Sequence, residues 1–102
     1  MLGIRKYREI AVDLWLGSPA SFVADAILGT EELARISSLC NFRHLVLVPE
    51  AEDRPAEIFS ELLLQLGSLS VGGKLRRVTL ILEDKPRYQA FQTALFATFP
   101  EL

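Results

Sequence analysis

The chain has 102 residues, half of them hydrophobic, with 13 acidic and 11 basic residues and a formal net charge of −2. This length predicts a single domain over residues 1–102, the acidic balance predicts no nucleic-acid partner, and no apolar run approaches the roughly 18 residues of a membrane span. Because the start does not resemble a signal peptide and the one cysteine, Cys40, forms no internal disulfide, a cytoplasmic protein is expected.

The first predicted element is a strand over residues 8–16. Apolar side chains alternate there with less apolar ones, which is the period of a strand that buries one face. Asp13 and Trp15 share the opposite face, where an acid is unusual. Gly17 and Ser18, followed by proline, end the strand. The apolar positions are Ile10, Val12, Leu14 and Leu16.

Residues 22–28 come next and fit either a short buried strand or a helical turn. A short helix is then predicted over 30–41. Thr30 is typical of a helix N-cap, and Glu31 with Glu32 suits the positive end of the helix dipole.

The rest of the chain repeats one unit, a buried strand followed by Asp, a base, Pro and an amphipathic helix. The first copy has a strand over 44–49 and a helix over 54–66; the second has a strand over 76–83 and a helix over 86–99. Continuous apolar runs of this kind are typical of parallel strands covered on both faces. The pattern predicts a three-layer α/β domain with a mostly parallel or mixed sheet of about four strands.

Acidic residues follow both of these strands. At the carboxyl ends of parallel strands they could hold a ligand. The alternative, which we favour, is that Asp53 and Asp84 cap the helices that begin beside Pro55 and Pro86. Basic residues precede the first and last predicted strands and are interpreted as solubilising charge. They are Arg5, Lys6, Arg8, Lys74, Arg76 and Arg77.

The residue types that carry catalysis or bind metal do not form a recognisable pattern. His44 is the only histidine, and with Cys40 it lacks the third ligand that a zinc site needs. The segment 67–74 has glycines and a lysine, but it lacks the spacing and the strand–loop–helix order of a phosphate-binding loop. Ser18 and Ser21 lack a nucleophile elbow. The sequence therefore predicts no catalytic residue, no metal and no cofactor.

The order of elements resembles a macro domain, the fold that binds ADP-ribose in many proteins. That family has Gly-Asp-Ile-Thr after its first strand and then Asp-Ala-Ile-Val-Asn-Ala-Ala-Asn. Gly17 and Ser18 stand at the first motif, and 25–28, Asp-Ala-Ile-Leu, stand at the second with matching spacing. The strand ending at Pro49 and the final strand and helix also match. The resemblance implies a ligand site formed by Asp13, Gly17, Ser18, Asp25 and Pro49.

The departures from that family imply that its ligand machinery is lost. Ser18 replaces the aspartate that grips adenine, and Gly-Thr-Glu-Glu over 29–32 replaces the asparagine-rich run. An acidic segment, 50–53, stands where the family has a glycine-rich loop, and negative charge opposes a bound pyrophosphate. The chain is therefore similar to a shortened, degenerate macro domain, in which binding of a nucleotide is doubtful.

Three functions remain open at this point. The first is a non-catalytic interaction module, with assembly into a homo-oligomer as one form of it, because Trp15, Phe96 and Phe99 exceed what a small core can cover. The second is binding of ADP-ribose or a related nucleotide. The third is an unrecognised small hydrolase that uses Asp13, Asp25 or His44. The interaction module is favoured.

Overall fold

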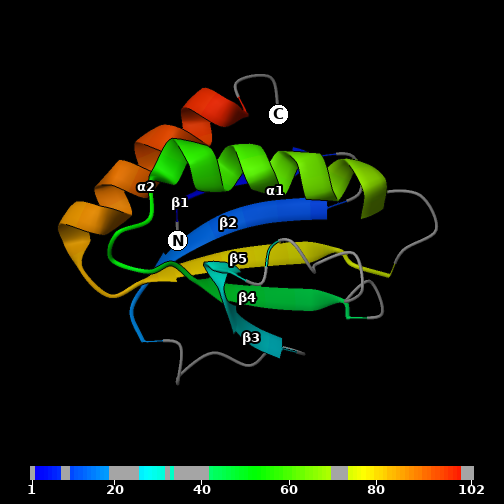
Figure 1. The fold of residues 1–102 in the computed structure, drawn as a ribbon, viewed down its shortest axis with the longest axis horizontal. Helices are drawn as coiled ribbons and strands as arrows, with labels where there is room; N and C mark the ends of the chain where they lie inside the picture. The colour runs from blue at the N-terminus through cyan, green and yellow to red at the C-terminus, as the bar shows by residue number, and fades with distance from the viewer. Residues whose placement is uncertain are drawn as a thin grey trace.

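A computed structural model gives the fold (Figure 1) and describes residues 2–7, 10–18, 26–31, 33, 42–69 and 74–99. Its Cα radius of gyration is 12.3 Å, close to the ~13 Å of a compact domain of about 100 residues. The elements are β1 (Leu2–Tyr7), β2 (Ile10–Leu16), β3 (Ala26–Gly29), β4 (His44–Val48), α1 (Pro55–Leu69), β5 (Arg77–Leu82) and α2 (Lys85–Thr98).

The strands form one mixed sheet in the order β1-β2-β5-β4-β3. The last four strands of this row are parallel, and β1 runs antiparallel to β2. Val78 of β5 lies opposite Val12 on one side and Leu45 on the other. The α/β class and the mixed sheet are confirmed, with five strands where about four were predicted.

The start of the fold differs from the prediction of one strand over 8–16. The chain forms two strands, and Tyr7 of β1 pairs with Ile10 of β2. Arg5 and Lys6, interpreted as charge ahead of a strand, are strand residues. Charged side chains are common on edge strands because they discourage pairing with another chain, and they hide the apolar alternation that predicts a strand.

The ambiguous segment 22–28 ends in strand β3, with residues 22–25 outside the described part. A 3₁₀ turn begins at Thr30, and most of the helix predicted over 30–41 also lies outside it. Both described helices lie over the same face of the sheet (Figure 1) and pack against each other. The described residues therefore form two layers, a sheet and a helical layer, instead of the three predicted.

The main core lies between the sheet and the helical layer. Phe59 of α1 is fully buried and meets the rings of Phe91 and Phe99 edge-to-face, at centroid distances of 5.9 and 6.3 Å. Phe99 is only 1% exposed, so the expectation that it lies at the surface is wrong. Alternate strand residues complete this core, among them Ile10, Val12, Leu14, Leu45, Leu47, Val78, Leu80 and Leu82.

The two helix starts differ, although their sequences are alike. The Asp84 carboxylate accepts a hydrogen bond from the backbone N–H of Arg87 at 2.9 Å, so the predicted N-cap is confirmed. Asp53 lies two residues before Pro55, and its carboxylate accepts hydrogen bonds from the backbone N–H of Glu50 and from the Thr30 hydroxyl instead. At the other end α1 runs past its predicted end at 66 to Leu69, and Gly67 lies inside it.

Replacing Asp84 with alanine is expected to lower the free energy of unfolding by about 1 kcal/mol, because the cap bond at the start of α2 is lost. Asp84→Ser keeps a side-chain oxygen that can accept the cap hydrogen bond, and its free energy of unfolding should fall by only a few tenths of a kcal/mol. Urea unfolding followed by circular dichroism measures both. Equal losses in the two variants would contradict the capping role.

Candidate functional site

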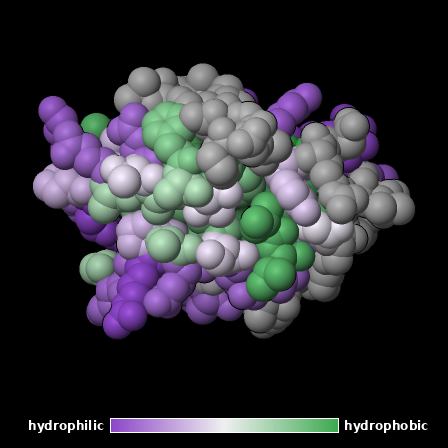
Figure 2. Space-filling model, turned by 90° about the horizontal axis from the view of Figure 1, so that it is seen from above, coloured by the Kyte–Doolittle hydropathy of each residue, from purple (hydrophilic) through white to green (hydrophobic). Residues whose placement is uncertain are grey.

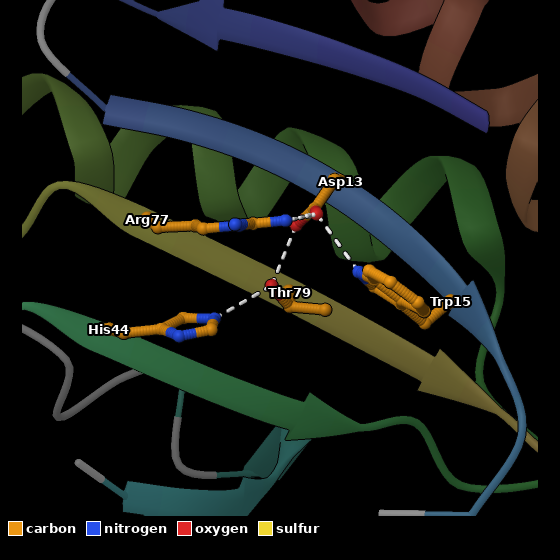
Figure 3. Close-up of polar contacts among 5 residues, drawn as sticks. All are labelled: Asp13, Trp15, His44, Arg77 and Thr79. Atoms are coloured by element: carbon orange, nitrogen blue, oxygen red, sulfur yellow. Dashed lines mark hydrogen bonds and ion pairs between the residues drawn. The ribbon is translucent and has the colours of Figure 1, made fainter. Parts of the chain in front are cut away.

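A chain of polar side chains crosses the face of the sheet that lies away from the helices (Figure 3). Asp13 of β2 is fully buried and accepts hydrogen bonds from Arg77 and Thr79 of β5 and from Trp15. The bond from Thr79 measures 2.6 Å and that from the Trp15 indole 3.1 Å. His44 of β4 lies 2.8 Å from the Thr79 hydroxyl. We call these five residues the polar chain.

The register of the parallel strands assembles the polar chain. Asp13 is paired with Thr79, and Arg77 is paired with His44. Residues two apart on a strand share a face, so Trp15 joins Asp13 and Arg77 joins Thr79. Val46 and Ile81 share this face and are buried beside them, at 0% and 1% exposure. The polar chain is therefore embedded in a second buried surface, apart from the main core.

The hydrogen bonds of Thr79 determine which atoms carry protons. Its hydroxyl donates to the Asp13 carboxylate, so its oxygen is left to accept from His44. The Nε2 atom of His44 therefore carries a proton. Three donors satisfy the buried carboxylate, as a buried charge requires. With no exposed surface, Asp13 cannot touch a substrate, and this arrangement fixes three neighbouring strands together.

The residues that the macro-domain resemblance implies are only partly brought together. Gly17 and Ser18 follow the end of β2, and Pro49 follows the end of β4, so all three lie at the carboxyl edge of the sheet. Asp13 lies within the sheet, among the polar chain. Asp25 is outside the described residues. Gly17 has a φ of 151°, which favours glycine, and its N–H donates to the carbonyl of Leu82 at 2.9 Å.

The loop after β4 is closed by its own side chains at this edge. One oxygen of Asp53 accepts from the backbone N–H of Glu50 at 2.7 Å and from the Thr30 hydroxyl. The guanidinium of Arg87 donates to the carbonyls of Pro49 and Glu50. The Asp53 carboxylate thus accepts the hydrogen bond of the Glu50 backbone N–H, a donor that would otherwise be available to a phosphate.

Negative charge dominates this edge. Glu31 folds back over the end of β3, where a Cβ on Gly29 would lie 2.6 Å from its carboxylate. The exposed acids of the two strand–helix loops add to it, which disfavours an anionic ligand here. They are Glu50, Glu52, Glu83 and Asp84.

Three further sequence interpretations concern metal ligands, His44 and Arg77. Among the residues described, no three potential metal ligands gather in one place. His44, considered from the sequence as a metal ligand or a hydrolase residue, forms a hydrogen bond with the Thr79 hydroxyl. The role of Arg77 was missed, because it was interpreted as solubilising charge. Arg77 lies two residues before Thr79, so the two side chains share a face of the strand, and this spacing could have indicated that both contact Asp13.

The helical layer carries the most exposed large apolar side chain of the described residues, Leu64 of α1 at 72%. The other two, Leu16 and Ile27, are 48% and 46% exposed and lie on strands. Seen from above in Figure 2, the most hydrophobic side chains form a patch right of the centre of the surface, and less hydrophobic ones are mixed with hydrophilic residues to its left.

Comparisons with models of known protein families, with curated protein sequences and with solved structures find no match for this chain. The resemblance to a macro domain therefore stays a prediction from sequence motifs. In the part of the chain that the structure describes, no helix combines the length and the apolar character needed to cross a bilayer.

Proposed function

We propose that this chain is a non-catalytic interaction module that pairs with a second copy of itself through the helical layer. The observation that carries the proposal is an exposed apolar side chain, Leu64 of α1, in a helical layer whose other helix, α2, has no charged residue from Tyr88 onward. We define the helical face as Ser60 and Leu64 of α1 with Ala90, Thr93 and Ala97 of α2, all of which are exposed.

The lack of charge over most of α2 favours a second copy as the partner. From Tyr88 to Phe99 this helix has no acidic or basic residue. In a two-fold dimer the same patch meets itself, so any charge at its centre meets a like charge. An uncharged face avoids this repulsion. Among the described residues, the ion pair nearest to the helical face joins Arg54 and Glu57 at the start of α1, and both side chains are highly exposed.

The size of the helical face sets the expected strength of the dimer. Helices of 15 and 14 residues are about 20 Å long, and two of them side by side cover roughly 400 Å². A standard interface buries about 800 Å² per partner. The helical face is about half that size and therefore supports a weak dimer that exchanges rapidly.

Sedimentation velocity over a concentration series tests this proposal. The mean mass of the wild-type chain should rise from the monomer value toward twice that value between about 10 μM and 1 mM. Leu64→Glu should weaken association at least about tenfold, because it places like charges at the centre of the contact. The matched control, Leu16→Glu, adds the same charge on a strand and should associate like the wild type.

The salt dependence separates an apolar contact from an ionic one. Association through the helical face should persist when sodium chloride is raised from 0.05 to 0.5 M, because apolar contacts are not screened. Dissociation by salt, a wild-type monomer at 1 mM, or unchanged association of Leu64→Glu would each contradict the proposal.

Nucleotide binding and hydrolysis have less support in the site geometry. The acids and the bound Glu50 amide disfavour a diphosphate at the carboxyl edge, and Asp13 has no surface to offer a substrate. Titration calorimetry with ADP-ribose distinguishes the alternatives. We expect no heat of binding at millimolar ligand, and a saturable signal would favour the nucleotide.

A further inference from the structure

The opposite, amino edge of the sheet has a basic pocket that none of the functions above uses. Its volume is about 360 Å³, and the described residues that line it are Arg43, Lys74 and Arg76. Arg43 comes directly before β4, and the other two lie in the segment before β5. All three are exposed residues. Parallel pairing of β4 with β5 brings these two segments together.

Backbone hydrogen bonds hold the walls of this pocket in place. The N–H groups of Arg76 and Arg77 both donate to the carbonyl of Arg43, at 2.8 and 3.1 Å. The carbonyl of Arg76 accepts from the N–H of Ala11 in β2, at 2.9 Å. Leu75, between two of the bases, is fully buried in the main core. The backbone that carries the bases is therefore held by hydrogen bonds among three strands, and the Arg76 guanidinium also donates to the carbonyl of Leu75 at 2.9 Å.

The described residues that line the pocket carry charge of one sign. None of its described lining residues is acidic. The next row of the sheet adds one more base, Lys6, which lies opposite Ala11 of β2. Asp13, the acid nearest in register, is fully buried and paired with Arg77. Several cations close together raise the local potential and attract a multiply charged anion.

We infer that this pocket binds an anion carrying two or more phosphate groups. Arginine presents a planar fork that matches phosphate oxygens, and lysine adds a mobile point charge. The pocket volume lies at the lower end of the range of small-molecule sites, so it holds a group the size of a pyrophosphate or a tripolyphosphate. This site lies at the edge opposite to Gly17 and Pro49, and it does not depend on dimer formation.

Titration of the full chain with inorganic phosphates tests this inference. Calorimetry in 50 mM salt should give tripolyphosphate the highest affinity, with pyrophosphate next and orthophosphate at least about tenfold weaker than tripolyphosphate, because each added charge gains another contact. Citrate serves as a carboxylate of similar charge. Citrate binding as tight as tripolyphosphate would show a non-selective charge effect and would overturn the assignment to phosphate.

Single neutralising variants locate the site. Lys74→Gln should weaken tripolyphosphate binding about tenfold, the size of one charge-assisted contact. The matched control, Lys85→Gln, removes an exposed lysine at the opposite edge and should bind within about twofold of the wild type. The amide proton spectrum of each variant confirms that it is folded. Equal affinity in both variants, or no binding of tripolyphosphate at millimolar concentration, would overturn the inference.

Discussion

Asp13→Ala is expected to lower the free energy of unfolding by about 3 kcal/mol. The substitution removes the carboxylate that accepts three hydrogen bonds. The hydroxyl of Thr79, which is fully buried, then loses the acceptor to which it donates. Loss of one partner of a buried ion pair costs about 3–5 kcal/mol. We expect a loss at the lower end of this range, because the Arg77 side chain is 36% exposed and can turn toward water.

Urea unfolding of a double-mutant cycle measures the coupling inside the polar chain. Thr79→Val keeps the shape of the side chain but removes its link between Asp13 and His44. We expect Asp13→Ala and Thr79→Val to be non-additive by about 1 kcal/mol or more, because they share one hydrogen bond. Additive effects, or a loss below about 1 kcal/mol in Asp13→Ala, would show that the polar chain does not stabilise the sheet.

Phe59→Ala should be the most damaging substitution in the main core, with a loss of about 3–5 kcal/mol. Phe59 is fully buried and joins α1 to α2 through its edge-to-face contacts with Phe91 and Phe99. A domain of this size has only about 5–15 kcal/mol of stability. The variant should therefore be largely unfolded or close to it at 37 °C.

Phe59→Leu provides the comparison, because it keeps most of the apolar volume and loses only the ring contacts. We expect it to lose about 1–2 kcal/mol. Thermal unfolding by calorimetry ranks the wild type and the two variants. A loss in Phe59→Ala as small as that in Phe59→Leu would mean that the helices do not pack around this ring.

The central strands and both long helices could be predicted from the sequence, because their signals are local. Strands β4 and β5 are continuous apolar runs, and each is followed by the Asp–base–Pro start of a helix. Strand β1 was missed because Arg5 and Lys6 interrupt its apolar pattern. The roles of the two aspartates could not be separated from sequence, since Asp53 binds Thr30, whose distance from it depends on the tertiary fold.

The polar chain and the basic pocket form only because strands far apart in the sequence pair in a particular register. Local sequence patterns do not contain that information. Asp13 was noticed as an unusual acid, but its partners Arg77 and Thr79 lie more than 60 residues away in the chain. Their meeting requires β2 to pair with β5 in one particular register. The basic pocket likewise needs Arg43 to lie beside Lys74, so Lys74 and Arg76 were interpreted as solubilising charge and no role was predicted for Arg43.

Amide chemical shifts followed during dilution test the central claim most directly, because they locate the contact between copies. Between about 1 mM and 50 μM, shifts should change at the helical face, on Ser60, Leu64, Ala90, Thr93 and Ala97, and should stay constant across the polar chain. Concentration-dependent shifts confined to the strands or to either edge of the sheet, or no change anywhere, would contradict the account.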